Sequence, residues 1–349
     1  MLAMLLAWAT AASAAAGWTV VPSVDPSAGT NVLNGVAVRN SGDAWAVGHF
    51  TAPDQDDDGL NMLTEHWNGS RWSQVAAPAV LRQDESLLAV SASSATDAWA
   101  VGFTKTVGAA GRFPLAAHWN GSAWAIVPTP TLTGGSKSTL NGVVALSANN
   151  AWAVGRGRNG AALAEHWNGR AWSIVPSGNA TSSNLLTGVA AIAGNNVWAV
   201  GYAITTDGTN QPDKTMIQHW NGSAWSLVAS PSPASNDTLS GVAARSATDG
   251  WAVGTRQDRS GAIPIDRTLT EHWNGTTWSV VASPKRRRQR QPAQRRERHH
   301  RRRLGGRLLR RLRPHPRPPR DRLTGSGASP RRLPAAKGPG THRFRVPSA

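Results

Sequence analysis

Apolar and polar residues alternate in short runs along most of this chain, and no run keeps the 3.6-residue period of an amphipathic helix. Gly, Asn, Asp, Ser and Pro separate the runs, as is typical of turns between strands. The pattern therefore predicts an all-β protein. Five apolar runs of five to seven residues are the clearest strand candidates: Leu33 to Val38, Leu87 to Ser91, Leu140 to Leu146, Leu186 to Ile192 and Leu239 to Ala244.

A unit of three motifs recurs five times. The tetrapeptide WAVG begins at Trp45, Trp99, Trp152, Trp198 and Trp251, and HWNG begins at His66, His118, His166, His219 and His272. A third tryptophan follows each HWNG, at Trp72, Trp124, Trp172, Trp225 and Trp278. Successive HWNG motifs lie 52, 48, 53 and 53 residues apart, a period that indicates a repeat architecture.

Each unit contains four short β-compatible segments, which predicts one four-stranded blade of a β-propeller. The Asn-Gly of HWNG predicts a type I′ turn, with positive φ at both residues, between the third and fourth strands. Ser-Ala-x-Asp before WAVG predicts the turn between the first and second strands. We expect a propeller over residues 17–284, with five complete blades in this chain and about six, or seven, in the intact gene product.

The tryptophans fit either a sugar-binding surface or a core. All of the 17 except Trp8 occupy one of the three repeated positions, so none is left over as a separate platform. Because each can bury roughly 200 Å², the repeated positions favour a structural role. The five histidines of HWNG likewise predict a repeated hydrogen bond or packing contact, because a ligand role would require five equivalent sites.

The amino terminus has the features of a targeting segment. Residues 1–16 are apolar and end in small residues, with Ala12-Ser13-Ala14 as an A-x-A cleavage site, which predicts a signal peptide and secretion. No Lys or Arg precedes Arg39, and a buried helix is the alternative interpretation. Residues 18–23 (WTVVPS) match a fourth strand without its own blade, and this orphan strand is expected to complete the last blade and close the ring.

Residues 285–349 differ from the rest in charge. They hold 23 Lys and Arg against 2 Asp and Glu, whereas residues 1–284 hold 14 against 18. At face value this is a disordered basic tail that binds acidic polymers or nucleic acid. Read one nucleotide further on, however, Leu304-Gly305-Gly306-Arg307 can encode Trp-Ala-Val-Gly, 53 residues after Trp251.

Two further positions fit the same reading frame. Gln289 to Pro292 can encode Asn-Asp-Asn-Leu, and Arg295 can encode Val, both at the 53-residue offset from the fifth unit. We therefore interpret residues 285–349 as a frameshifted sixth blade, in which case nucleic acid is not an expected partner.

The WAVG…HWNG…W pattern resembles secreted bacterial β-propeller repeat proteins grouped with kelch and galactose-oxidase central domains. The resemblance covers residues 17–284. The turn from Asn68 to Trp72 is also similar to the Asp-box hairpin of sialidase-type propellers, except that Trp67 stands where that motif has its Asp. The chain has no Cys and one tyrosine, Tyr202, so the Tyr-Cys copper site that a galactose-oxidase likeness implies is excluded.

The connections that vary between repeats lie, by blade topology, on one face of a propeller. These are the segments between the second and third strands and between successive blades, and we expect the ligand to bind there. One such segment fits a calcium loop, D-x-D-x-D-G-x5-E, with candidate ligands Asp54, Asp56, Asp58, the carbonyl of Leu60 and Glu65. A solvated acidic loop is the alternative, because Glu recurs at this place before HW in other repeats.

The sequence favours a secreted, non-catalytic propeller that binds protein or glycan partners through this face. An exported glycan-active hydrolase or lyase is the alternative, and His49 near the acidic loop is the one unrepeated His that such an enzyme could use. Ca²⁺ is the only cofactor that the sequence suggests. No apolar run reaches the roughly 18 residues of a membrane span.

Overall fold

A computed structural model describes residues 20–51, 59–79, 83–106, 111–130, 132, 137–204, 213–258 and 263–283. The chain divides into two units, Met1–Arg286 and Arg287–Ala349, and the second lies wholly outside the described residues. The predicted signal peptide (1–16) and basic tail (285–349) therefore also lie outside them. Among the described residues no helix is long and apolar enough to cross a membrane.

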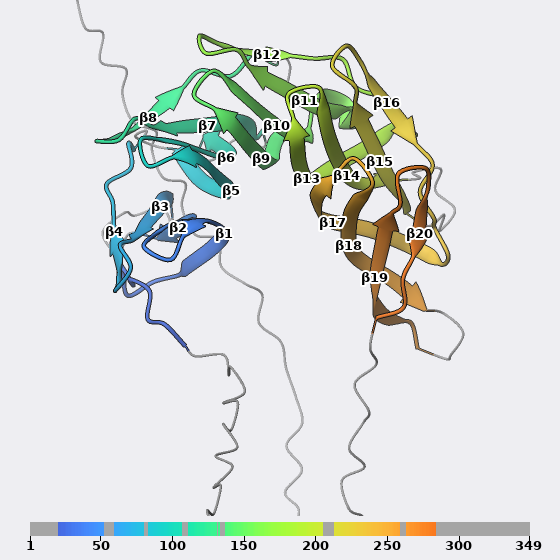
Figure 1. Cartoon of the computed structure of the whole chain (residues 1–349). Helices are drawn as coiled ribbons and strands as arrows, with labels where there is room; N and C mark the ends of the chain where they lie inside the picture. The colour runs from blue at the N-terminus through green and yellow to red at the C-terminus, as the bar shows by residue number, and fades with distance from the viewer. Residues whose placement is uncertain are drawn as a thin grey trace, which may run out of the picture. The chain divides into compact units, whose positions relative to one another are not determined.

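The first unit is all-β, as the residue pattern predicts, and is built from four-stranded antiparallel sheets whose strands follow chain order (Figure 1). Blade 1 comprises β1 (Asn31–Asn40), β2 (Asp43–Thr51), β3 (Leu60–Trp67) and β4 (Trp72–Gln74). Blade 2 comprises β5 (Gln83–Ser94), β6 (Asp97–Thr106), β7 (Phe113–Trp119) and β8 (Trp124–Val127). Blade 3 comprises β9 (Thr139–Ser147), β10 (Asn150–Arg156), β11 (Ala162–Trp167) and β12 (Trp172–Ile174), with the 3₁₀ turn η1 (Arg158–Gly160) between β10 and β11.

Blades 4 and 5 repeat the arrangement. Blade 4 comprises β13 (Ser183–Ala193), β14 (Asn196–Ile204), β15 (Lys214–Trp220) and β16 (Trp225–Val228). Blade 5 comprises β17 (Ser235–Ser246), β18 (Asp249–Asp258), β19 (Ile265–Trp273) and β20 (Trp278–Val280). Each sequence motif thus has a fixed place: WAVG lies in the second strand, HW ends the third, and the third tryptophan begins the fourth.

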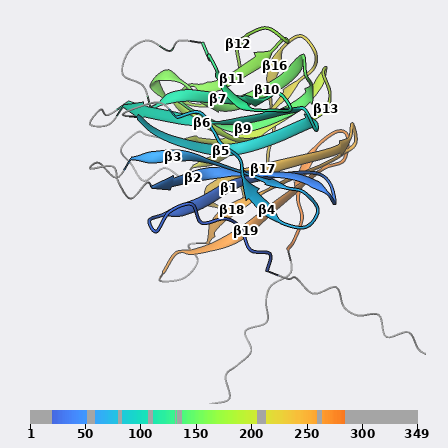
Figure 2. The same cartoon turned by 90° about the vertical axis from the view of Figure 1, so that its left-hand side faces the viewer.

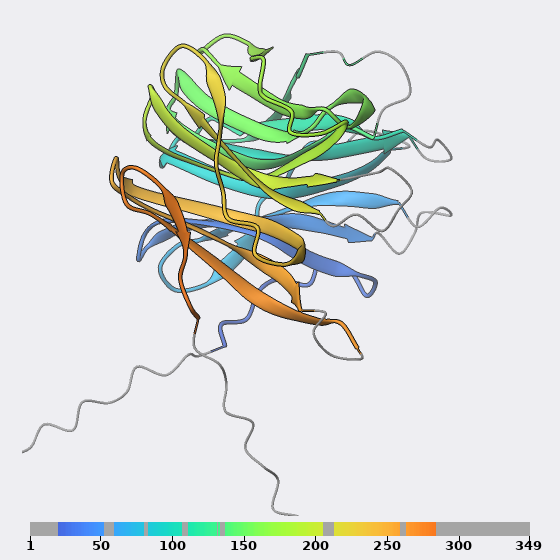
Figure 3. The same cartoon turned by 90° about the vertical axis from the view of Figure 1, so that its right-hand side faces the viewer.

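The sheets are arranged as propeller blades, each packing on the blade before it through its first strand. β5 packs on β1, β2 and β3 (Figure 2), and β9 and β13 make the same contacts with their preceding blades. β17 packs on β13, β14 and β15, so that blade 5 (orange) lies beside blade 4 (yellow) in Figure 3. The predicted five four-stranded blades are confirmed.

The hydrophobic core lies between blades, and two buried tryptophans from neighbouring blades belong to each of its four clusters. Trp45 of blade 1 is 1 % exposed, and its ring lies 4.9 Å from that of Trp119 and 5.0 Å from that of Trp124, both in blade 2. The same three-ring contact joins blades 2 and 3, 3 and 4, and 4 and 5. The predicted structural role of the repeated tryptophans is confirmed, because a single blade cannot bury these rings alone.

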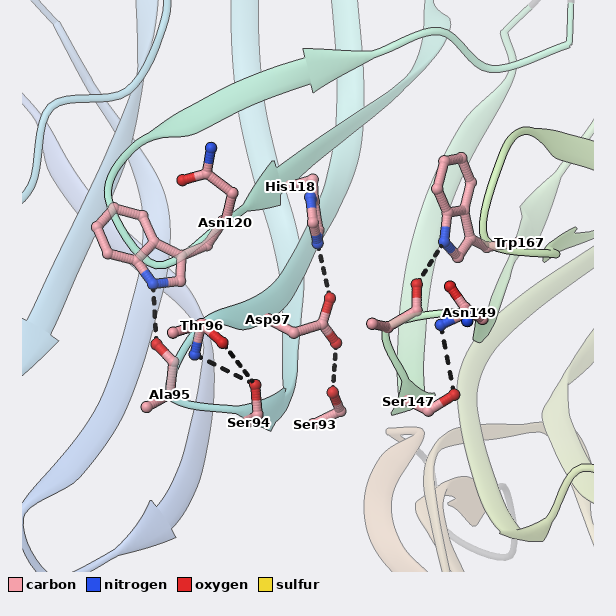
Figure 4. A network of polar contacts seen from close by, with 12 residues as sticks. Ser93, Ser94, Ala95, Thr96, Asp97, His118, Asn120, Ser147, Asn149 and Trp167 are labelled. Carbon is pink, nitrogen blue, oxygen red and sulfur yellow. Dashed lines mark hydrogen bonds and ion pairs between the residues drawn. The ribbon is translucent and has the colours of Figure 1, made fainter.

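The HW pair fastens the third strand to the turn between the first and second strands. In blade 2, His118 Nε2 lies 2.7 Å from Asp97 Oδ1, and the indole N–H of Trp119 donates to the carbonyl of Ala95 at 3.1 Å. Figure 4 shows this contact beside its neighbour in blade 3, where the indole of Trp167 donates to a turn carbonyl. All five blades have both bonds, so the predicted repeated hydrogen bond of the histidines is confirmed.

The predicted type I′ turn is wrong. In blade 1 the last strand pair is Trp67 with Trp72, which leaves a four-residue loop rather than a two-residue one. Only Gly69 has positive φ, +93°, while Asn68 does not. The Oδ1 of Asn68 accepts hydrogen bonds from the N–H groups of Ser70 and Arg71, both at 3.1 Å. Asn therefore serves as a side-chain acceptor that closes the loop, and only its glycine needs the left-handed region.

The predicted closing strand is not seen in residues 20–23, which form no strand. Val20 is 96 % exposed and Val21 is 48 % exposed. A strand needs a neighbouring strand for its backbone hydrogen bonds, and the described residues contain no blade for this segment to complete. Trp18, which begins the segment, lies outside the described residues.

Candidate functional site

One position in every blade combines a fixed backbone geometry with a variable side chain. It is the residue immediately after WAVG, near the end of the second strand. We call these five residues the edge row: His49, Phe103, Arg156, Tyr202 and Thr255. Their backbones are equivalent, since each pairs with the residue before the leucine that begins the apolar run of the first strand.

The glycine of WAVG explains why the five residues of the edge row have the same backbone position in each blade. At this point the first strand has a register shift, and a Cβ on Gly155 would lie 1.9 Å from the carbonyl oxygen of Thr139. The glycines at the other four copies meet a carbonyl at 1.8 or 1.9 Å. Because only glycine allows this close approach, the bulged strands position the next side chain alike in each blade.

Side chains of the edge row reach the first strand of the following blade. His49 Nδ1 lies 3.0 Å from the hydroxyl of Ser86, and Arg156 Nη2 donates to the hydroxyl of Ser183 at 3.1 Å. Burial lowers the pKa of His49, which favours its neutral form. This histidine is therefore engaged with blade 2.

Blades 3 and 4 bring a cation, a phenol and a carboxylate together. Burial raises the pKa of Tyr202, the charge of Asp213 raises it further, and the charge of Arg156 lowers it, so all three groups interact. Burial also raises the pKa of Asp213. Asp213 follows the variable segment between β14 and β15, and its N–H donates to Asn236 Oδ1 of blade 5 at 3.2 Å.

The raised pKa of Tyr202 limits the chemistry of this cluster. A phenol with a pKa above its ordinary value of 10 stays protonated at neutral pH, so it can donate and accept hydrogen bonds but is a poor nucleophile. Arg156 adds a fixed positive charge that suits a carboxylate or another anionic group. The arrangement is suited to binding a polar ligand through an aromatic ring, a cation and hydroxyl groups.

Blade 2 contributes a second aromatic and cationic pair. The guanidinium carbon of Arg112 lies 4.2 Å from the centre of the Phe103 ring, a cation–π distance. Arg112 is exposed and begins the return of the variable segment into β7, and its carbonyl accepts from the N–H of Ser138 at 3.1 Å. The variable edge thus carries one arginine stacked on an aromatic ring, in blade 2, and one arginine whose charge acts on a phenol, in blades 3 and 4.

The sequence identified the variable segments and singled out His49, but it did not identify the edge row as a set. Tyr202 stood out only as the single tyrosine, and Arg156 only as the first residue of a variable segment. An alignment of the five units would have shown a column of His, Phe, Arg, Tyr and Thr directly after an invariant glycine. What it could not show is that Asp213 lies near Tyr202, because a variable segment separates them along the chain.

Of the candidate calcium ligands, Asp54, Asp56 and Asp58 lie outside the described residues. Leu60 begins β3, and its N–H donates to Asp84 Oδ1 at 3.3 Å. Glu65 lies five residues further along the same strand and is fully buried. At about 3.3 Å per residue, an extended strand separates these two residues by roughly 16 Å. The calcium site stays a prediction.

Glu65 belongs instead to a column of buried polar side chains in the third strands. Glu165 and Glu271 occupy the same place before HW, and all three are 0 % exposed. Burial raises the pKa of Glu165 to about 8 and that of Glu271 to about 7. The Glu271 carboxylate accepts from Ser230, while neither Glu165 oxygen has a hydrogen-bond partner among the described residues.

A cavity of about 520 Å³ lies between the outer strands of blades 4 and 5. The end of β16 and the residues that follow it, Leu227 to Pro231, form one wall, and Trp273, Thr276, Thr277 and Trp278 form the other. The indole N–H of Trp273 is already bonded to the carbonyl of Ala247, and Trp278 belongs to the inter-blade core. The cavity therefore offers an apolar wall with few free polar groups.

Comparisons with known proteins identify similar folds. No protein-family model and no curated protein matches the chain. Among solved structures, YCF48 bound to D1 peptide is 13% identical, with a TM-score of 0.40 over 75% of this chain and 88% of that chain. A fucose-specific lectin from Aleuria aurantia is 11% identical, with a TM-score of 0.44 over 72% and 76%. YjhT is 11% identical, with a TM-score of 0.44 over 73% and 86%.

Proposed function

We propose that this protein is an exported, non-catalytic binding module whose ligand, a glycan or a peptide, contacts the edge row and the variable segments around it. The observation that carries the proposal is the edge row itself. Five positions with one backbone geometry carry five different side chains, whereas the contacts that hold the blades together repeat almost without change. Variation on a rigid frame is typical of binding surfaces.

The chemistry of the row supports binding more than turnover. The raised pKa of Tyr202 keeps its phenol protonated at neutral pH, which suits hydrogen bonding to a ligand better than nucleophilic attack. Among the described residues no group of three or more His, Asp and Glu side chains is placed to hold a metal ion. Tyr202 with Arg156, and Phe103 with Arg112, supply ring faces and cations that suit sugar hydroxyls, acidic sugars or peptide side chains.

The test is a binding screen of the purified full chain on arrays of immobilised oligosaccharides and peptides. For any probe that binds, we expect Tyr202→Ala and Arg156→Gln each to weaken affinity tenfold or more, about 1.4 kcal/mol. Gln74→Ala is the matched control, because Gln74 is exposed on the outer strand β4. Equal binding by all variants would contradict the proposed surface.

The same screen addresses the enzymatic alternative. If the full chain converts an oligosaccharide to smaller products, and Tyr202→Phe or Asp213→Asn abolishes that turnover, the binding-only function is wrong. Export is tested separately by whether the amino terminus of the protein, isolated from its natural source, begins after the predicted A-x-A site at residues 12–14.

A further inference from the structure

Blade 5 leaves the interface-forming part of its second strand open to solvent. Trp251 is 40 % exposed and Val253 is 49 % exposed. The equivalent residues of blade 1, Trp45 and Val47, are 1 % and 0 % exposed, because blade 2 covers them. The same two positions in blades 2, 3 and 4 are at most 4 % exposed. Blade 5 therefore presents an uncovered copy of a surface that is buried four times elsewhere.

Blade 1 leaves the complementary surface open on its first strand. Leu33 is 41 % exposed and Val36 is 63 % exposed. The equivalent leucines of the other four blades are 0 % exposed, and Val90, the counterpart of Val36 in blade 2, is 8 % exposed. Each of those blades packs its first strand on a preceding blade. Blade 1 therefore presents the other half of the same interface.

The open surfaces of blade 5 and blade 1 are the two halves of the contact that joins neighbouring blades elsewhere in the protein. At every closed interface the WAVG tryptophan of one blade meets the HW and fourth-strand tryptophans of the next. Trp251 provides the first part, while Trp67 and Trp72 of blade 1, with rings 5.7 Å apart, provide the second. A polar bond between first strands repeats as well: Asn34 donates to the carbonyl of Leu87, and Thr187 to that of Leu239.

We propose that these surfaces bind one further blade of the same repeat, seated between blade 5 and blade 1. The occupant is the blade encoded by the nucleotides of codons 285 onward, read one base later. It would bring an HW tryptophan to Trp251 and a WAVG tryptophan to Trp67 and Trp72. Trp18 to Ser23 would form its fourth strand.

The length and position of the remaining chain fit this occupant. The last residue that the structure describes is residue 283, three residues after the end of β20, and the chain continues for 66 more residues. One complete repeat unit has about 52 residues, and the first three strands of a blade, without the fourth, need fewer. Trp-Ala-Val-Gly at position 304 requires CTG or TTG for Leu304, GGC for Gly305, GGT for Gly306 and CGG or AGG for Arg307. The nucleotide sequence must show these codons.

The amino-terminal segment supplies the missing outer strand. Val21 corresponds to Val75, Val127, Val175 and Val228, which follow the fourth-strand tryptophan by three residues and pack against the inter-blade clusters. In this structure Val21 is instead 48 % exposed. A sixth blade would bury it by offering a third strand to pair with.

The experiment compares the full printed chain with a chimera in which residues 285–349 are replaced by a second copy of residues 232–275, which hold strands one to three of blade 5. Oxidation of Trp251 by N-bromosuccinimide is followed by mass spectrometry, melting by calorimetry, and molar mass by light scattering. We expect a monomeric chimera, at least tenfold slower oxidation of Trp251, and a Tm higher by about 5 °C or more.

Val21→Asp makes the comparison specific. It should leave the Tm of the printed chain unchanged and lower that of the chimera, since only the chimera buries Val21. Equal oxidation of Trp251 in both proteins would overturn the proposal. The proposal would also be overturned if the full printed chain were a dimer in which Trp251 is protected from oxidation, because a second copy of the chain would then cover the open surfaces. If codons 304–307, read one base later, cannot encode Trp-Ala-Val-Gly, the sixth blade is not encoded by this gene and the proposal is overturned.

Discussion

Gln218 holds the backbone of Gly178 at two points: its amide N–H donates to the carbonyl at 2.8 Å, and its amide oxygen accepts from the N–H at 3.2 Å. Gly178 lies in the segment that leads from blade 3 into blade 4. The side chain of a third strand thus fixes the segment that enters its own blade. In blade 3 the same place is occupied by Glu165, which in its protonated form has the donor and acceptor of an amide.

We expect the stability of the protein to fall with rising pH through Glu165. Burial raises its pKa from 4.5 to about 8, so between these values the native state binds a proton that the unfolded state has lost. The stabilising contribution is complete below about pH 4.5 and is lost as the pH rises through 8. Glu165→Gln should be more stable than the parent at pH 8.5, by about 2–4 kcal/mol, and similar to it at pH 5.

Urea unfolding at the two pH values measures this difference. Asp266→Asn is the control, because Asp266 is exposed on β19 and its substitution should give the same change in unfolding free energy at both. A Glu165→Gln variant that is equally stable relative to the parent at pH 5 and pH 8.5 would show that this carboxylate does not titrate as its burial indicates.

Gly155→Ala should destabilise the protein by about 2 kcal/mol or more, because the added Cβ would lie 1.9 Å from the carbonyl oxygen of Thr139. Gly157→Ala is the matched control two residues away, where the nearest atom would be 3.5 Å distant and φ is −93°. Chemical denaturation compares the two. Equal effects would argue against a close strand approach at the WAVG glycine.

Trp198→Ala should cost about 3–5 kcal/mol, because this ring is 4 % exposed and packs against Trp273 and Trp278 of blade 5. Trp251→Ala should cost much less in the printed chain, since its ring is 40 % exposed. Thermal unfolding of both variants gives the comparison. A larger loss at Trp251 would mean that a partner already covers blade 5.

Asp97→Ala should destabilise blade 2 by about 1–3 kcal/mol, because it removes the acceptor that binds His118 and Ser93. Asp97→Asn should be close to neutral, since Asn150 and Asn196 bind the corresponding histidines at 3.0 and 2.8 Å in blades 3 and 4. Denaturant midpoints of the two variants test whether hydrogen bonding, rather than charge, fixes the HW pair. If both variants lost the same free energy of unfolding, the negative charge of Asp97 rather than its hydrogen bonds would fix the HW pair.

If the acidic loop binds Ca²⁺, millimolar Ca²⁺ should raise Tm, and Asp56→Asn should abolish the rise. A concentration one hundred times the Kd corresponds to about 2.7 kcal/mol. Mg²⁺ at the same concentration controls for ionic strength, and Asp266→Asn controls for loss of a carboxylate elsewhere. An unchanged Tm would favour a solvated loop.

The repeated motifs by themselves determine the fold of this chain. WAVG, HWNG and the third tryptophan fixed the number of complete blades, the order of their strands and the burial of the indoles. They could do so because a blade cannot bury its own tryptophans and must stack on another. The HWNG turn was predicted wrongly. Asn-Gly propensity assumes a two-residue turn, whereas the side chain of Asn68 accepts from the N–H groups of Ser70 and Arg71 and closes a four-residue loop.

The tertiary structure decided which residues meet across blades. The pairing of β14 with β15 brings Asp213 close to Tyr202 within blade 4. Arg156 belongs to blade 3, and only the packing of blade 4 on blade 3 lets its charge act on Tyr202. Exposure of Trp251 and Leu33 is likewise invisible in a sequence where both positions look like every other copy. The local sequence pattern specifies which side chains of each blade must be buried. Which neighbouring blade buries them is decided by the three-dimensional packing.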